Sequence, residues 1–261
     1  MSKFFAVVNA SMQEYFQTRW HTFAWTIFGL LFTVLNYLLW STILRHSGMS
    51  SIGGLTARGI LVYYLALNIL DTYSGIMWMI SSDIQSGRII SFLVRPIDYI
   101  LGNLAADVGS AFIRIGFKCL PVFIIGYLII GRFFTPSLAI LGVISAVLGY
   151  LIQAFLSALM GLAVVWTKLK NGLFSFYEVI SGFFGGWIIP LSILPPFLYI
   201  FALLTPFPYM IFFPITVFMG IWSYQQVAAI MVFQIVWVII LSLFVKFVWQ
   251  LAREHLEGVG V

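Results

Sequence analysis

Residues 83–104 read DIQSGRIISFLVRPIDYILGNL, and this charged, proline-containing stretch lies between two long apolar runs. Asp83, Arg88, Arg95 and Asp98 all fall within it, whereas the segments on either side carry almost no charge. In a membrane protein, such a stretch is typical of a connection between two spanning segments. The apolar runs before and after it are therefore expected to be membrane spans.

The composition predicts an integral membrane protein. Hydrophobic residues make up 62% of the chain and charged residues only 8%, against about 25% charged residues in ordinary soluble domains. The 261 residues hold about six spanning helices of roughly 20 residues each, and leave no room for a large soluble domain. We therefore expect an all-α, polytopic fold in which residues 1–261 form one membrane domain. Cys119 is the only cysteine, so an internal disulfide is excluded.

Three segments are predicted before the quoted stretch. Residues 4–20 favour a helix that lies in the membrane surface, because apolar side chains recur at helical spacing and polar ones share another face. The alternative is that these residues form the first turns of a long spanning helix. Residues 22–44 predict the first span, and residues 59–82 predict the second.

After the quoted stretch, residues 108–131 and 137–165 predict the third and fourth spans. The fourth carries small residues at a spacing that lets helices approach closely: Gly142, Ala146, Gly149, Ser157 and Gly161. A fifth helix is expected over 172–190. Six of the nine prolines then fall between 190 and 214. Proline removes a backbone donor, so we expect a broken, re-entrant segment to about 214 and a last span over 226–249.

The basic residues predict the orientation of the chain. With the amino terminus in the cytoplasm, ten of the thirteen Lys and Arg residues lie inside, and only Arg45, Arg58 and Arg132 lie outside. This positive-inside bias places both termini and the quoted stretch in the cytoplasm, and the proline-rich segment on the outer face.

Pro96 divides the quoted stretch into two short helical pieces joined by a bend, because proline disfavours helical geometry at Arg95. Before the bend, Ile89, Ile90 and Leu93 are expected to pack against the membrane domain. After it, Asp98 and Asn103 are expected opposite an apolar side. Two roles stay open at this point. The element is a docking site for a cytosolic partner, or a solvated loop whose arginines meet anionic lipid headgroups at about 1 kcal/mol each.

Two longer runs resemble a known family. DIQSGRIISFLVRPIDYILGNLAADVG, residues 83–109, is similar to the segment after the second span of ABC-2 type permeases, in particular the six-helix ABC-2 family transporter proteins. It has their glycine, phenylalanine-leucine pair and arginine-proline. The run FYEVISGFFGGWIIPLSILPPFLYIFALLTPFPYMIFFPITVFMG, residues 176–220, looks like the fifth helix and extracellular hairpin of the same family. The resemblance covers essentially the whole chain.

The resemblance implies the permease half of an ATP-powered exporter for a hydrophobic or amphiphilic substrate in a prokaryotic plasma (inner) membrane. It implies six spans, an N-terminal interfacial helix, a cytoplasmic coupling helix between spans 2 and 3, and a re-entrant hairpin between spans 5 and 6. The residues expected to couple to the ATPase are Asp83, Gln85, Gly87, Arg88, Arg95, Pro96 and Asp98. The prolines expected in an external gate are Pro190, Pro195, Pro196, Pro206 and Pro208.

The partners follow from the same resemblance and from one absent motif. The sequence contains no G-x-x-x-x-G-K-[ST], the loop that cradles ATP phosphates. No cofactor is therefore expected in this chain, and ATP and Mg would be held by separate ABC ATPase subunits, two in number. A second permease, identical or related, is also implied.

Polar residues within the predicted spans are candidates for the translocation path, which the resemblance places between two permeases. Tyr64, Asn68, Asp71 and Gly75 are spaced to lie on one stripe of the second span. A carboxylate at mid-membrane costs about 2.5–3.5 kcal/mol, so Asp71 is expected to face protein or water. The candidates for the path are Asn36, Tyr64, Asn68, Asp71 and Glu178.

Each acidic candidate also has a structural interpretation. Asp71 could pair with Arg114 or Lys118 on the third helix, and Glu178 could serve the membrane interface. A different function, a channel or a proton-coupled carrier, would use Asp71 and Glu178 without an ATPase. A membrane-embedded enzyme is disfavoured, because the three histidines lie at separate places in the topology.

Overall fold

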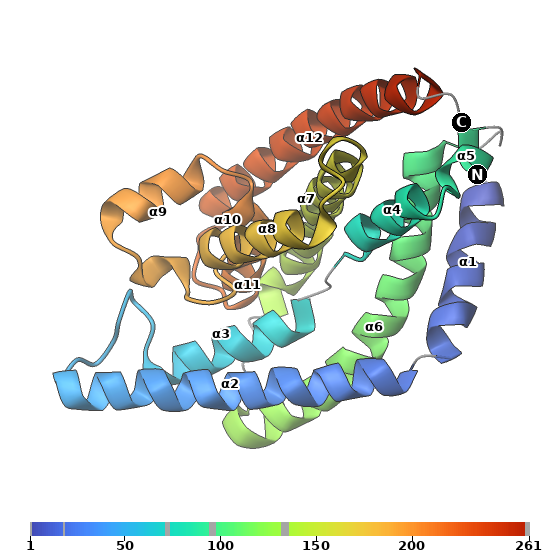
Figure 1. Ribbon diagram of the computed structural model, residues 1–261. Helices are drawn as coiled ribbons and strands as arrows, with labels where there is room; N and C mark the ends of the chain where they lie inside the picture. Colours follow the sequence, from blue (N-terminus) through green and yellow to red (C-terminus); the bar gives the residue numbers. More distant parts are fainter. Residues whose placement is uncertain (1, 18, 71–73, 94–97, 132–135, 259–261) are drawn as a thin grey trace.

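The computed structural model describes residues 2–17, 19–70, 74–93, 98–131 and 136–258. These residues form helices and connecting turns, with one isolated β-bridge between Ile52 and Leu55. Figure 1 shows long helices crossing one another, with a group of short helices on one side. The expected all-helical class is confirmed.

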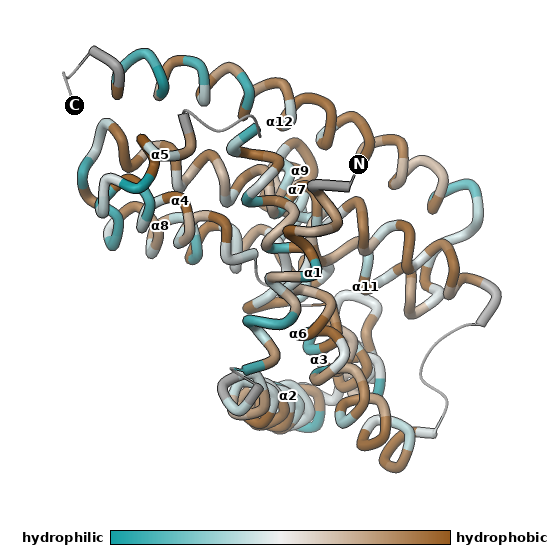
Figure 2. Tube along the Cα trace, turned by 90° about the vertical axis from the view of Figure 1, so that its right-hand side faces the viewer, coloured by the Kyte–Doolittle hydropathy of each residue, from teal (hydrophilic) through white to brown (hydrophobic). Residues whose placement is uncertain are grey.

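The first helix is separate from the first span. Helix α1 (Ser2–Gln17) packs along α6 (Tyr99–Ile130), and it runs across the direction of α2 (Arg19–Ser47) in both views (Figures 1 and 2). Gly109 of α6 permits the contact, because a Cβ there would meet the backbone carbonyl of Val8. The alternative in which α1 forms the first turns of the first span is therefore wrong.

Among the described residues, four helices are long and apolar enough to cross a membrane. They are α2, α6, α7 (Pro136–Thr167) and α12 (Tyr224–Gly258). These helices match the predicted first, third, fourth and last spans. The chain is therefore built as a multi-pass membrane protein.

The second span predicted over 59–82 is not one uninterrupted helix. Helix α3 (Ala57–Leu70) ends and α4 (Ile76–Gln85) begins after the non-helical Ser74 and Gly75. The 14 residues of α3 span about 21 Å, which is shorter than a hydrocarbon core of about 30 Å. The third span also begins earlier than expected. What was predicted as the second short piece after Pro96 is the start of α6.

The proline-rich region is broken, as predicted. Helix α8 (Lys170–Phe184) ends earlier than the predicted fifth helix, and short helices follow it. They are η1 (Leu191–Ile193), α9 (Pro196–Leu203), α10 (Phe207–Met210) and α11 (Phe212–Phe218). We call residues 185–218 the hairpin segment. Five of its prolines stand at helix starts, where a missing N–H has no intrahelical partner to lose: Pro190, Pro195, Pro196, Pro206 and Pro208.

Several helices pack against α7. The prediction that its small residues let other helices approach closely is confirmed at three glycines. A Cβ on Gly149 would lie 2.5 Å from the carbonyl oxygen of Met210, and one on Gly161 would lie 2.8 Å from the Cβ of Ile80. A Cβ on Gly142 would lie 2.9 Å from the ring of Phe218. Only glycine allows α4, α10 and α11 to approach α7 this closely.

The elements that connect the long helices lie in two groups, at opposite sides of the molecule. Helix α5 (Ile89–Leu93), the start of α1 and the end of α12 lie toward the right in Figure 1, whereas α9 and the α2–α3 link lie toward the left. Hydrophilic residues gather near α5 and near the C-terminal end of α12, while the middle of α12 is hydrophobic (Figure 2).

Candidate functional site

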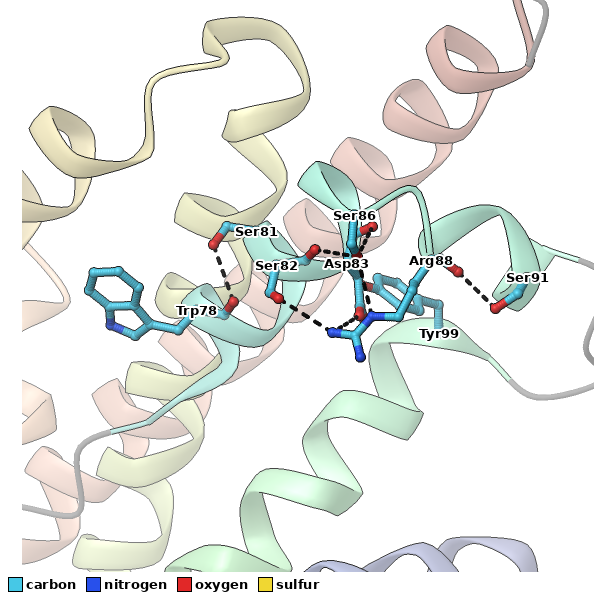
Figure 3. Close-up of polar contacts among 8 residues, drawn as sticks. All are labelled: Trp78, Ser81, Ser82, Asp83, Ser86, Arg88, Ser91 and Tyr99. Carbon is cyan, nitrogen blue, oxygen red and sulfur yellow. Dashed lines mark hydrogen bonds and ion pairs between the residues drawn. The ribbon is translucent and has the colours of Figure 1, made fainter. Parts of the chain in front are cut away.

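A buried carboxylate joins the turn between α4 and α5 to the start of α6. Asp83, at the end of α4, is 8% exposed. Its Oδ2 accepts a hydrogen bond of 2.9 Å from the Tyr99 hydroxyl, and its Oδ1 lies 3.1 Å from Arg88 Nη2 (Figure 3). Tyr99 in turn stacks on Trp249 of α12 at 4.8 Å between ring centroids. One carboxylate therefore joins the α4–α5 turn to α6, which rests on α12.

The turn between α4 and α5 requires a glycine and is fixed by its own polar side chains. Gly87 has φ +70°, a conformation that side chains rarely adopt. Arg88 donates to Ser86 Oγ at 3.2 Å and to Ser82 Oγ at 3.3 Å, and Ser91 Oγ donates to the carbonyl of Arg88 at 2.8 Å (Figure 3). The result is a compact polar knuckle, residues 82–91.

The knuckle presents a polar outer surface over an apolar base. Gln85, Gly87 and Arg88 are exposed, and the Arg88 side chain retains 63% of its accessibility. Ile89 is buried, as expected, but Ile90 is 37% exposed, so the prediction of inward packing is wrong for Ile90. Phe92 is partly buried and packs against the core. Arg95, Pro96 and the side chain of Leu93 lie outside the described residues.

Asp98 has a local structural role. Its side chain accepts a hydrogen bond of 2.9 Å from the Leu101 backbone N–H, so it caps the start of α6. A carboxylate at a helix N-terminus also faces the positive end of the helix dipole. The prediction that Asn103 lies opposite the apolar side is wrong, because Asn103 is 7% exposed and donates to the Tyr99 carbonyl, while Leu101 is 56% exposed.

The candidates for a translocation path do not form one stripe. Helix α3 ends at Leu70, so Gly75 lies beyond the helix that carries Tyr64 and Asn68. Asp71 lies outside the described residues. Asn36, half-buried on α2, donates to the Phe32 carbonyl of its own helix.

Asn68 and Tyr64 are fully engaged inside the protomer. Asn68 is 5% exposed, and its Nδ2 donates to the Gly29 carbonyl and to Thr33 Oγ1, each at 2.7 Å. The Tyr64 hydroxyl donates to the Ile188 carbonyl at 2.9 Å. These side chains therefore join α2, α3 and the hairpin segment within this chain. Glu178 is an exposed residue of α8.

The hairpin segment is fastened to α2 and α3 at its start. Tyr63 donates to the Gly186 carbonyl at 2.7 Å, and Phe32 of α2 stacks on Trp187 with 4.9 Å between ring centroids. Pro190 is buried at the turn that follows, and Pro208 is buried within α10. The expected gate prolines thus shape a segment that α3 holds in place.

A cavity of about 570 Å³ lies between the α2–α3 link and the hairpin segment. Its lining includes Thr56, Tyr199, Phe212 and Trp222, and none of the described residues that line it is charged. The volume falls within the range of about 300–1,000 Å³ that is usual for small-molecule sites. An uncharged lining suits apolar rather than ionic molecules.

A second buried carboxylate was not among the predicted site residues. Asp107 of α6 is 1% exposed and lies 3.2 Å from Arg114. The sequence assigned Asp107 to the connection before the third span, and offered Asp71 as the partner of Arg114. One available signal was the spacing of seven between Asp107 and Arg114, which places both on one helix face about two turns apart.

A protein-family model matches most of the chain. The family described as "ABC-2 family transporter protein" matches residues 30–260. None of the curated proteins compared with the chain matches it. The family match covers most of the chain and includes both the knuckle and the hairpin segment. The chain therefore belongs to the ABC-2 family transporter proteins and is a permease component of an ABC transporter.

Proposed function

We propose that this chain is the permease subunit of an ABC exporter that moves a hydrophobic or amphiphilic substrate outward, using ATP hydrolysed by separate subunits. Family membership supports the permease role. The observation that supports a coupling role is the structure of the knuckle. Its exposed polar surface is joined to the rest of the fold by the buried contact between Asp83 and Tyr99.

The knuckle has the properties that mechanical coupling needs. Its outer surface is mostly polar, because Gln85, Gly87 and Arg88 are exposed, and Ile90 adds a smaller apolar area. Docking on a soluble ATPase therefore leaves little apolar area in water when the subunits separate. Its base is buried, because Asp83, Ile89 and Tyr99 are each less than a tenth exposed. A displacement imposed on Arg88 is therefore passed to α4 and α6 instead of being absorbed by a loose loop.

The topology we propose has six membrane passages, with α3 and α4 together forming the second and α8 with the hairpin segment forming the fifth. Helix α1 would lie beside the cytoplasmic half of α6, which it contacts at Gly109 and Arg114, and both termini and the knuckle would face the cytoplasm. The ten-to-three distribution of basic residues supports this orientation. Two ATPase subunits and a second permease would complete the transporter.

The proposed outer gate is the hairpin segment. Broken helices at membrane depth are tolerated only within protein or beside a cavity, and the cavity between the hairpin segment and the α2–α3 link meets this condition. Because Tyr63 and Tyr64 of α3 hold the start of the hairpin segment, tilting α3 would move the gate. The uncharged lining of the cavity supports an apolar or amphiphilic cargo.

Charge reversal at the knuckle tests this function. Arg88→Glu, assembled with its ATPase and reconstituted in vesicles, should still hydrolyse ATP while transport per ATP falls by about fivefold or more. Because a glutamate at this position would lie beside the Asp83 carboxylate, Arg88→Gln, which removes the charge without adding a like one, is measured alongside it and should show the same direction of change. Lys168→Glu, an exposed residue of the α7–α8 link, is the matched control for charge. Wild-type ATPase activity and transport in Arg88→Glu would contradict the proposal.

A further inference from the structure

Three helices meet at the carboxylate of Asp107. Its Oδ1 accepts a hydrogen bond of 3.0 Å from the Gly75 backbone N–H, which precedes α4, and lies 3.2 Å from Arg114 Nη2 of its own helix. Its Oδ2 accepts a hydrogen bond of 2.6 Å from the Tyr150 hydroxyl of α7. Both oxygens of a side chain that is 1% exposed are thus engaged. Asp107 directly joins the start of α4 to α6 and α7.

Arg114 extends this junction to α1. Its guanidinium carbon lies 5.4 Å from the centroid of the Tyr15 ring, and its Nη1 donates to Ser110 Oγ at 2.7 Å. Tyr15 accepts a hydrogen bond from Thr22 of α2 at 3.2 Å. The Arg114 side chain is 12% exposed, so a cation over an aromatic face is partly shielded from water and correspondingly stronger. We call Asp107, Arg114, Tyr150 and the Gly75 N–H the Asp107 junction.

The junction lies at the opposite end of α4 from the knuckle. Gly75 is the N-cap residue of α4, and Asp83 is near its C-terminal end. Gly75 has no side chain with which to cap the helix. The Asp107 carboxylate accepts from the Gly75 N–H, and Ser74 Oγ accepts from the Ile76 N–H at 3.5 Å, so two side chains satisfy donors at this helix start. Helix α4 is thus held at both ends by a buried carboxylate, and each carboxylate joins it to α6.

We infer that Asp107 is a positioning residue through which movement of the knuckle and α4 is passed to α1, α6 and α7. The inference rests on the proposed coupling function. A displacement of α4 must either break the Gly75 hydrogen bond or carry the Asp107 carboxylate with it. Because Asp107 is buried and charge-paired, losing a partner is costly, and the whole junction is expected to move as a unit.

Asp107→Asn tests the inference, since it keeps the shape of the side chain and removes its charge. In the complete complex in vesicles, ATP hydrolysis should continue while transport per ATP falls by about three- to thirtyfold, the size of change found for substitutions within coupled networks. Tyr150→Phe removes only the donor to Oδ2 and should cause a smaller fall. It also keeps the inference testable should Asp107→Asn fail to fold.

A distance measurement separates coupling from simple stabilisation. Spin labels on cysteines at Ala10 of α1, which is exposed, and Met79 of α4, which is partly exposed and lies outside the knuckle, would be introduced in a Cys119→Ala background. With the junction intact, α1 and α4 move together, so the distance between the labels should be the same in nucleotide-free and ATP-trapped complexes. In Asp107→Asn, this distance should differ between the two states.

Ser145→Ala is the control. Ser145 lies on α7, as Tyr150 does, and its buried hydroxyl donates to Gln234 of α12 at 3.0 Å, away from α4. This change should lower stability but leave transport per ATP at the wild-type value. The inference is overturned if Asp107→Asn and Tyr150→Phe behave like Ser145→Ala, with wild-type transport per ATP and an unchanged label distance. A wild-type complex without ATP-driven transport would instead overturn the proposed function.

Discussion

Tyr63 and Gly186 are 123 positions apart in the sequence, and the Tyr63 hydroxyl donates a hydrogen bond of 2.7 Å to the Gly186 carbonyl. Gly186 has φ +87°, so the chain turns sharply at the residue that α3 holds. The neighbouring Tyr64 binds the Ile188 carbonyl. Two consecutive tyrosines thus fix the start of the hairpin segment to α3, without any salt bridge.

The first prediction concerns this bond. Tyr63→Phe should lower the free energy of unfolding by about 1–3 kcal/mol, because the buried Gly186 carbonyl loses its described partner. Denaturation in detergent, followed by tryptophan fluorescence, measures the change. Tyr224→Phe is the control, since the Tyr224 side chain on α12 is 62% exposed and should have little effect. Equal stability of the two variants would show that the bond contributes nothing.

The second prediction uses two helical glycines. Ala normally exceeds Gly in helix propensity by about 1 kcal/mol, and Gly116→Ala of α6 should follow this rule, because nothing lies within 4 Å of its new Cβ. Gly161→Ala should show the opposite sign, since the Cβ would lie 2.8 Å from Ile80 and 3.1 Å from the backbone of Met77. Overpacking of this kind costs about 1–3 kcal/mol. Thermal unfolding of both variants checks the difference in sign.

Much of the fold was predictable because membrane residence constrains the sequence strongly. Apolar length identified the four long helices, and small residues on α7 identified its close contacts. The proline cluster predicted the broken segment. The division of the second span was not predictable from apolarity, since Asp71 is the only charged residue in 59–82 and the polar ones are scattered along it. The break occurs around Gly75, whose backbone N–H is bound by a side chain 32 positions away, and such a partner is not visible in local sequence.

For the candidate site, the sequence indicated which segment to examine but not the side-chain contacts within it. The sequence located the knuckle through its charges, but it could not show that Asp83 points inward to Tyr99 while Arg88 stays exposed. Tyr64 and Asn68 were selected as polar residues within a span, and they serve contacts within the protomer. Polarity in a span indicates only that a partner exists, because an unsatisfied group there is costly. Whether the partner is protein or cargo depends on tertiary contacts.

The third prediction concerns the α2–α3 contact. A Cβ on Gly29 would overlap the Asn68 side-chain oxygen, so Gly29→Ala should destabilise the protein. Asn68→Ala should also destabilise it, because Thr33 and the Gly29 carbonyl lose a buried donor. In the double variant the steric overlap is gone, so the combined loss should fall short of the sum by about 0.5–3 kcal/mol. Strictly additive losses would contradict this account of the contact.

The last prediction separates anchoring from docking at the knuckle. Asp83→Ala should lower the free energy of unfolding by about 1–3 kcal/mol in the isolated permease, because the buried Tyr99 hydroxyl loses its acceptor. Arg88→Ala should cost no more than about 1 kcal/mol, since its side chain is 63% exposed and exposed ion pairs are screened by water. If Arg88 faces the ATPase, Arg88→Ala should nevertheless impair transport strongly. The loss of transport divided by the loss of unfolding free energy should then be larger for Arg88→Ala than for Asp83→Ala. Unfolding in detergent and transport in vesicles are measured for both variants.

Equal stability losses for Asp83→Ala and Arg88→Ala would contradict this account. They would mean that the Asp83 carboxylate acts only through its ion pair, and that its hydrogen bond with Tyr99 does not anchor the knuckle.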